Sequence, residues 1–132
     1  MPPIVRRNAA ELAPPPGYAH VAVAPPGSLV FTAGAVPLDD GGRLVGVGDL
    51  RVQTEQVVAN LELALAAGGA TPADVLKTTV YVVSSRAEEL GLVWDAFRAS
   101  ALHAAPSTLL GIAALGYPGQ LVEIEAVAAS AG

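Results

Sequence analysis

The sequence predicts an α+β fold in which two helices cover one face of a mixed β-sheet. The first observation is the order of the expected elements: a group of short strands, then helix, strand, helix and two more strands. The second is that each helix stands between strands, so both helices can pack on the same side of one sheet. The third is the length of 132 residues, which suits a single domain over 1–132.

Short strands are expected before the first helix. Alternating residues at 20–24 and the apolar run at 29–33 have the character of strands, and residues 39–42 (DDGG) are a strong turn signal. Residues 43–45 then provide a short return strand. We expect these segments to pair with one another as an antiparallel meander.

The first long helix is expected between Asp49 and Gly68. The Asp49 carboxylate can accept hydrogen bonds from the free N–H groups of the first turn, and Gly68 ends the helix. A short helical turn follows at residues 71–74, with a Thr cap and Pro at the first position. The apolar stripe of the long helix comprises Val57, Leu61, Ala64 and Leu65.

The second half of the chain contains three expected strands and the second helix. Residues 77–83 are β-branched and aromatic, which favours a strand, and we expect two further strands at 108–112 and 121–128. The helix between them is expected to begin with a capping box of Ser85 and Glu88. Its buried stripe comprises Leu90, Val93, Trp94, Phe97 and Ala101.

Composition limits the classes of partner and site. Seven Lys and Arg residues against twelve Asp and Glu residues give a formal charge of −5, which argues against nucleic acid or an anionic membrane as a main partner. No cysteine is present, and the two histidines have no His-x-x-x-His spacing, so we expect no metal site. We also expect no cofactor.

The chain is apolar for its size, since 52% of its residues are hydrophobic and 14% are charged. It has no apolar run of about 18 residues, as a membrane-spanning helix requires, and its N-terminus has no apolar core typical of a signal peptide. A monomer of this composition would expose large apolar patches. We therefore expect a soluble, cytoplasmic homo-oligomer that buries apolar surface between its subunits.

Four stretches, in order, resemble the Rid family, the YjgF-like reactive intermediate/imine deaminases. They are residues 31–37 (FTAGAVP), 53–56 (QTEQ), 74–82 (DVLKTTVYV) and 122–126 (VEIEA). Each stretch alone is weak, whereas four at matching spacing are specific and cover nearly the whole chain. The resemblance implies a chorismate-mutase-like, RidA-like fold, a homotrimer and three small clefts between subunits.

Members of this family with deaminase activity hydrolyse reactive enamines and imines, such as 2-aminoacrylate, to a 2-keto acid and ammonia. They use a glutamate that positions water or moves protons, and a tyrosine near the N-terminus. The resemblance implies that Glu123, in the VEIEA stretch, is this glutamate, and that Tyr18 is this tyrosine. These two residues are the expected catalytic groups.

Three positions depart from the family's site chemistry. The family arginine that binds the substrate carboxylate falls at Ser107, next to Thr108, and a family serine and asparagine fall at Ala33 and Gly91. We expect these four residues to bind the substrate, with Tyr117 at the rim of the cleft. A hydrogen bond to a charged group contributes about 1.5–3 kcal/mol, so usual 2-aminoacrylate deaminase activity should be weak or absent. Restoring arginine at Ser107 is expected to improve carboxylate binding more than turnover.

Other chemistry-bearing residues have simpler structural interpretations. Lys77, the only lysine, is expected in a buried or interface ion pair rather than as a Schiff-base nucleophile. Glu125 lies two residues from Glu123 on one strand face and is expected to be structural. Arg86 and Arg98 in the second helix could replace the missing arginine from another face of the cleft.

Two classes of function remain open. The first is an enzyme that hydrolyses or deaminates a small imine, enamine or carbonyl metabolite in an intersubunit cleft, with Glu123 assisting. The alternative is a trimer that binds a small metabolite without turnover, or a regulatory trimer. A ligand observed in the cleft would distinguish these classes best.

Overall fold

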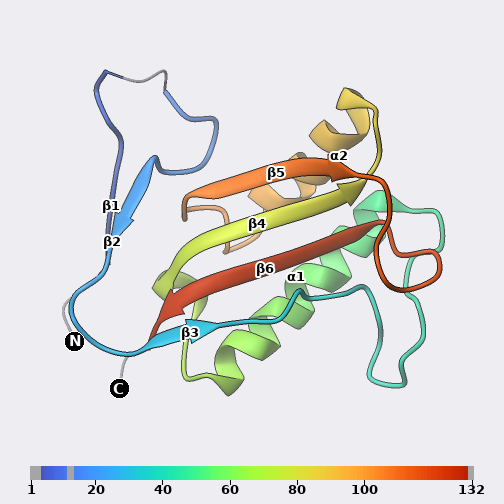
Figure 1. Cartoon of the computed structure of the whole chain (residues 1–132), viewed down its shortest axis with the longest axis horizontal. Coiled ribbons are helices and arrows are strands. Elements are labelled where there is room, and N and C mark those ends of the chain that lie inside the picture. Colours follow the sequence, from blue (N-terminus) through green and yellow to red (C-terminus); the bar gives the residue numbers. More distant parts are fainter. Residues whose placement is uncertain (1–3, 12–13, 131–132) are drawn as a thin grey trace.

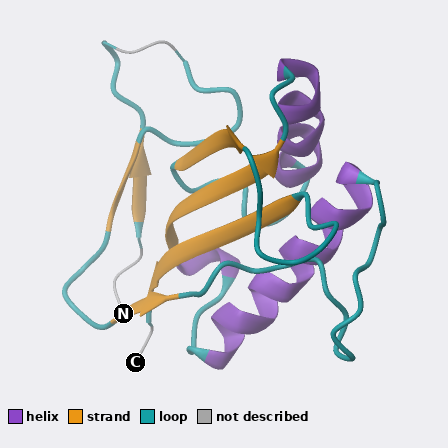
Figure 2. Ribbon diagram, turned by 45° about the vertical axis from the view of Figure 1, so that its right-hand side comes forward, coloured by secondary structure: helices purple, strands orange, loops and turns teal. Residues whose placement is uncertain are grey.

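A mixed β-sheet carries both long helices on one of its faces (Figures 1 and 2). The computed structural model describes residues 4–11 and 14–130. β4 and β5 run parallel, and both β3 and β4 run antiparallel to β6. The predicted α+β fold with two helices on one face of a mixed sheet is confirmed. The strand order is β3 (Leu29–Phe31), β6 (Val122–Ala129), β4 (Val75–Val83) and β5 (Ser107–Ile112).

Helix α1 (Leu50–Ala67) lies where the sequence predicted it. Asp49 accepts a hydrogen bond from the Val52 N–H at 3.0 Å, which is the expected N-cap. Most of the predicted apolar stripe is buried, but Ala64 is exposed and does not belong to it. After α1, the 3₁₀ turn η1 (Pro72–Asp74) is held by a hydrogen bond from the Thr71 N–H to the Asp74 carboxylate.

Helix α2 (Ala87–Arg98) begins differently from the prediction. The predicted capping box of Ser85 and Glu88 is wrong, because the N-cap is Arg86, and the side-chain hydrogen bonds at this end come from Ser84. Its hydroxyl accepts a hydrogen bond from the Arg86 N–H at 3.0 Å and donates one to Glu89 at 2.6 Å. Glu88 instead forms an exposed ion pair with Arg86. The side chain one position earlier therefore orders the first turn.

The C-terminal side of α2 also departs from the predicted stripe. Ala101 lies beyond the end of the helix and is exposed, whereas the next residue, Leu102, is fully buried. The chain leaves the helical path after Arg98, so the helical spacing no longer decides which side chain faces the core.

The predicted N-terminal meander is wrong. β2 (Val21–Val23) pairs with β1 (Val5–Arg7) in a separate two-stranded sheet, which stands beside the main sheet in Figure 1. β3 pairs with β6, and the predicted return strand at 43–45 is reduced to one isolated bridge between Leu38 and Leu44. Local alternation indicates a strand, but it does not specify the partner that satisfies its backbone groups.

The core lies between the sheet and the two helices. Its fully buried side chains include Val80, Val82 and Ile124 from the sheet and Leu61 and Phe97 from the helices. Because side chains alternate along a strand, the residues between these sheet positions point to the opposite face. The core packing therefore determines which polar side chains share that opposite face.

Candidate functional site

The sheet face that carries no helix in the described part of the chain is called the open face here. Side chains alternate between this face and the core from Lys77 to Val83 in β4 and from Val122 to Ala128 in β6. Polar groups gather at its centre and apolar groups at its β3 edge, where Leu29 and Phe31 are 53% and 71% exposed. The open face comprises Leu29, Phe31, Lys77, Thr79, Tyr81, Thr108, Leu110, Glu123, Glu125 and Val127.

Glu123 lies on the open face in a fixed environment. Buried Gln120 donates a hydrogen bond from Nε2 to Glu123 Oε1 at 3.2 Å. On the other side, a Cβ at Gly34 would overlap the Glu123 carboxylate, so the absence of a side chain there makes room for it. The bridge between Ala35 and Ile124 holds this backbone beside β6. The carboxylate is therefore positioned by groups from two separate segments.

The Gln120 side chain connects Glu123 to the loop before β6. Its Oε1 accepts a hydrogen bond from the Tyr117 N–H at 3.2 Å, and its Nε2 also reaches the Val122 carbonyl. Buried Gln53 of α1 anchors the same loop through the Gly119 carbonyl. Sequence reasoning missed both glutamines, although polar side chains next to Gly-rich turns are a signal for such anchoring.

Tyr81 and Glu125 form a second polar pair that sequence reasoning did not assign to the site. The Tyr81 hydroxyl donates a hydrogen bond to Glu125 Oε1 at 3.0 Å, and Tyr81 is the register partner of Glu123. The hydrogen bond to Glu125, burial and the two carboxylate charges raise the pKa of Tyr81 above its usual value of 10.0. The phenol therefore stays a neutral hydrogen-bond donor at neutral pH.

Lys77 lies at the other end of the polar region. Its Nζ donates a hydrogen bond to Thr108 Oγ1 at 2.7 Å across the β4–β5 pair. Lys77 makes no ion pair with any residue in the described ranges, where the recorded ion pair joins Arg86 and Glu88. The expected ion pair of this lysine is therefore not found within one chain.

Ser107 and Thr108 point to opposite faces. The Ser107 Oγ accepts a hydrogen bond from the buried Thr78 hydroxyl at 2.7 Å, on the helix side of the sheet. Thr108 lies on the open face with Lys77 and Glu123. The structure therefore brings Thr108, rather than Ser107, onto the face of the expected catalytic carboxylate.

Ala33 and Tyr117 flank Glu123 along the chain path. Ala33 is exposed and immediately precedes Gly34, while Tyr117 is 50% exposed in the loop that Gln120 anchors. Ala33 thus adjoins Gly34, which borders the Glu123 carboxylate, and Tyr117 lies in the loop of Gln120, which donates to that carboxylate.

Gly91 lies in α2, and Tyr18 packs against this helix. The Tyr18 ring packs edge-on against Trp94 with centroids 6.0 Å apart, and it also contacts His20. Gly91 is exposed, and a Cβ there would meet open space. No hydrogen bond or ring contact within the described residues joins Tyr18 to the open face.

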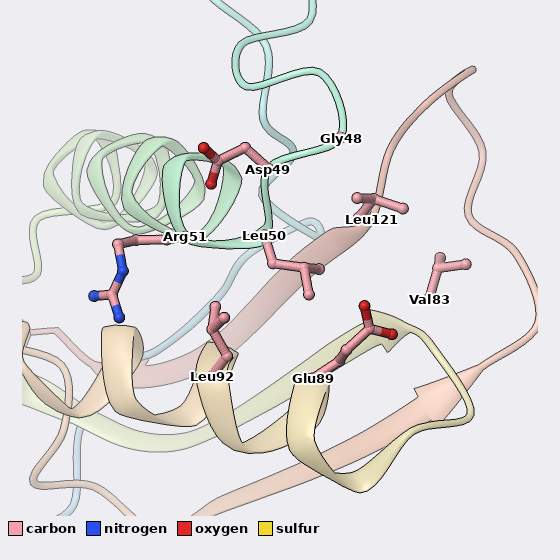
Figure 3. A pocket seen from close by; sticks show the side chains of 8 residues that line it. All are labelled: Gly48, Asp49, Leu50, Arg51, Val83, Glu89, Leu92 and Leu121. Carbon is pink, nitrogen blue, oxygen red and sulfur yellow. The ribbon is translucent and has the colours of Figure 1, made fainter.

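A pocket of about 500 Å³ lies apart from all these residues, between the first turns of α1 and α2 (Figure 3). Arg51 and Glu89 stand toward its two ends, with Leu50 and Leu92 between them. None of the residues that the sequence assigned to the site lines it. Its lining comprises Gly48, Asp49, Leu50, Arg51, Val83, Glu89, Leu92 and Leu121.

Within residues 4–11 and 14–130, no three His, Asp or Glu side chains lie close enough together to hold a metal ion. In the same part of the chain, no helix has the length and hydropathy needed to span a membrane.

Comparisons with known proteins identify the family. The sequence profile described as Endoribonuclease L-PSP matches residues 8–130. A RutC family protein of Pyrococcus abyssi is 35% identical over 72 residues, which are 54% of this chain and 57% of that protein. A RutC family protein of Pyrococcus horikoshii is 36% identical over 72 residues, which are also 54% of this chain and 57% of that protein. The match thus spans little more than half the length of these curated relatives.

Solved structures agree with this family. The Rid family protein YyfB from Yersinia pestis, a protein of unknown function, is 35% identical with a TM-score of 0.84, covering 96% of this chain and 98% of that one. RidA from an Antarctic Psychrobacter is 23% identical with a TM-score of 0.68, covering 94% of each chain, and so supports the fold alone. With a profile match over most of its length and a close structural neighbour named as Rid, the chain belongs to the Endoribonuclease L-PSP family, also called the YjgF/RidA or Rid family.

Proposed function

We propose that this protein hydrolyses a small imine, enamine or related carbonyl compound, with Glu123 as the acid/base group, in clefts between the subunits of a homotrimer. The observation that carries the proposal is the fixed carboxylate of Glu123, held by Gln120 beside the space left by Gly34. Membership of the Rid family supports a role in binding or processing small molecules.

The chemistry of this reaction needs one carboxylate and one water. Glu123 takes a proton from water as its oxygen attacks the C=N carbon, and it returns the proton to the nitrogen. This gives a carbinolamine. Glu123 then moves the proton of the new hydroxyl to the amine nitrogen as the C–N bond breaks and the C=O bond forms, so imine and water become a carbonyl compound and ammonia. Tyr81 does not compete for this role, because its hydroxyl donates to Glu125 rather than to Glu123.

The homotrimer is supported by the open face itself. Leu29 and Phe31 expose large apolar side chains at one edge of this face, as the composition of the chain led us to expect. A second copy that covers this edge would bury these apolar side chains between subunits. Light scattering at micromolar concentration tests the assembly, and a monomer mass would contradict it.

Within the cleft, we assign the ligand-binding position to Thr108 rather than Ser107. A side chain that holds the substrate beside Glu123 must lie on the same face of the sheet, and the Ser107 hydroxyl is used by Thr78. Because the chain has no arginine there, hydrolysis of carboxylated imines should be weak. The family name includes an endoribonuclease, but the charge of −5 and the two open-face glutamates oppose a polyanionic RNA substrate.

The test is a coupled assay in which a flavin-dependent amine oxidase produces an imine without a carboxylate from a primary amine, with 2-iminopropionate from an amino-acid oxidase as the carboxylated imine expected to be hydrolysed weakly. The wild-type protein should accelerate release of ammonia, and Glu123→Gln should lose about 100-fold or more of that acceleration. Glu125→Gln is the matched control on the same face and should lose less than about fivefold, since its partner is Tyr81. Full activity of Glu123→Gln would refute the proposed reaction.

The alternative function is a trimer that binds a small metabolite, with or without a regulatory output, and does not turn it over. Wild-type protein that binds a keto acid but accelerates no imine hydrolysis would favour this alternative. No observation within the described residues favours it over hydrolysis at present.

A further inference from the structure

We propose that Lys77, with the hydroxyls of Thr79 and Thr108, forms an anion-binding subsite on the open face that receives the carboxylate of a small monoanionic ligand. The inference rests on the proposed function, because it names the group that would hold the ligand in the same site. Lys77 of β4 would take over the role of the family arginine, whose position in this chain is Ser107 of β5.

The geometry brings these three side chains together. Lys77 and Thr79 are two residues apart on β4, so they share one face. Thr79 and Thr108 are register partners in the parallel β4–β5 pair. The Lys77 Nζ reaches Thr108 Oγ1 at 2.7 Å, so its side chain leans toward β5 and away from the glutamates of β6.

The charge of Lys77 is available to a ligand. A lysine ammonium has three donors, and one of them is used on a neutral hydroxyl. No carboxylate within the described residues pairs with it, and the nearest candidate on β6, Glu125, accepts from Tyr81 instead. An unpaired ammonium beside two hydroxyls is a donor set that suits an anion.

The set fits a carboxylate better than a phosphate. Dianionic phosphates are commonly held by bidentate arginines or by backbone N–H cradles, whereas this subsite offers one point charge and two hydroxyls. Glu123 and Glu125 on the same face also oppose a second negative charge. A lysine orients a carboxylate less rigidly than an arginine fork does, so we expect weak binding.

The experiment is a titration of the full-length protein with pyruvate, followed by NMR of the backbone amides of β4 and β5. Hydroxyacetone is the matched uncharged probe, and inorganic phosphate is the alternative anion. Pyruvate should bind more tightly than either. Lys77→Met should weaken pyruvate binding about tenfold or more and leave hydroxyacetone binding unchanged, while Lys77→Arg should retain pyruvate binding within about threefold.

Two further variants sharpen the result. Thr108→Val should weaken pyruvate binding about threefold, since it removes a neutral hydrogen-bonding group. Arg43→Met removes one positive charge from the exposed turn near Asp39 and should have no effect. Circular dichroism checks that each variant is folded. If Lys77→Met does not fold, Thr108→Val decides the test, because unchanged pyruvate binding in that variant would contradict the subsite.

Three outcomes would overturn the inference. They are unchanged pyruvate binding in Lys77→Met, an equal loss in Arg43→Met, or tighter binding of phosphate than of pyruvate. The result is separable from the proposed reaction, because Glu123→Gln should still bind pyruvate. If Lys77→Met loses binding while Glu123→Gln keeps full turnover, the subsite stands and the proposed role of Glu123 fails.

Discussion

The two faces of the sheet are made from the same strands but carry opposite kinds of side chain. On the helix face, Val80, Val82 and Ile124 are fully buried and pack against α1 and α2. On the open face, the residues between them are partly exposed, and Tyr81 and Glu123 are among them. The polar pair on the helix face, Thr78 and Ser107, is satisfied internally.

This difference separates stability from chemistry. Burying an apolar side chain such as valine or isoleucine contributes about 1.5–3 kcal/mol, so the helix face supplies the folding free energy. The open face keeps charged groups, Lys77 above all, that no opposite charge among residues 4–11 and 14–130 neutralises. Such groups are costly to cover unless a ligand or a second copy pairs with them. Substitutions on the two faces should therefore have different consequences.

The largest expected effect compares adjacent residues of β6. Ile124→Ala should lower the free energy of unfolding by about 2–5 kcal/mol, because it leaves a cavity in the core. Glu125→Ala should cost about 0.5–1.5 kcal/mol, the value of its hydrogen bond with Tyr81. Urea denaturation of both variants measures the contrast. Equal losses would mean that the open face is as important for stability as the core.

The second comparison places arginine on each face in turn. Ser107→Arg should destabilise the protein by about 1–3 kcal/mol, since the new side chain points toward buried Thr78. Thr108→Arg should be tolerated and should lower KM for 2-iminopropionate with little change in kcat, because it adds uniform binding. This revises the sequence-based expectation for Ser107. A lower KM in Ser107→Arg alone would restore that expectation.

The third prediction concerns the space beside Glu123. Gly34→Ala should displace the Glu123 carboxylate and lower kcat about tenfold or more, with the fold retained, because the added Cβ would overlap that side chain. Gly116→Ala is the matched control, since a Cβ there meets open space. Steady-state kinetics and thermal melting of both variants test it, and equal activity would show that Glu123 needs no fixed position.

The smallest effect is a pH dependence from Tyr81. Its pKa is raised in the folded protein, chiefly by the hydrogen bond to Glu125, so folding favours the neutral phenol. This contribution is complete below the unfolded pKa of about 10 and is lost as pH rises through the folded pKa. Wild-type stability should therefore fall more steeply than that of Tyr81→Phe as pH rises above about 10. Urea denaturation across this range measures the difference, and identical slopes would contradict it.

Much of the fold followed from local patterns in the chain. The Asp49 cap, the α1 stripe except Ala64, and the β-branched run of β4 fall where predicted, because capping, helical spacing and β-propensity act between near neighbours. The pairing of β3 with β6 did not follow, since the two strands are about ninety residues apart. The N-cap of α2 is Arg86 rather than the predicted Ser85, and the side-chain hydrogen bonds at this end come from Ser84.

The candidate site was predicted only in part. Glu123 was identified through its motif, and its strand position correctly placed it on one face with Glu125. Tyr81, Gln120 and Lys77 were missed or given other roles, because their partners are distant in the chain. Whether Tyr18 joins the site stays a prediction that depends on the assembly.

By itself, the sequence determined the helices, the main strands and the family, because these depend on residue types and short spacings. Only the tertiary structure decided which strands pair and which face each side chain occupies. Ser107 and Thr108 illustrate the reason: they are neighbours with similar hydroxyl groups, yet one is bonded toward the core and the other lies beside Lys77. Side chains alternate along a strand, so a shift of one residue reverses the face. Which of two neighbouring residues faces the core is decided by the packing of apolar side chains against the helices.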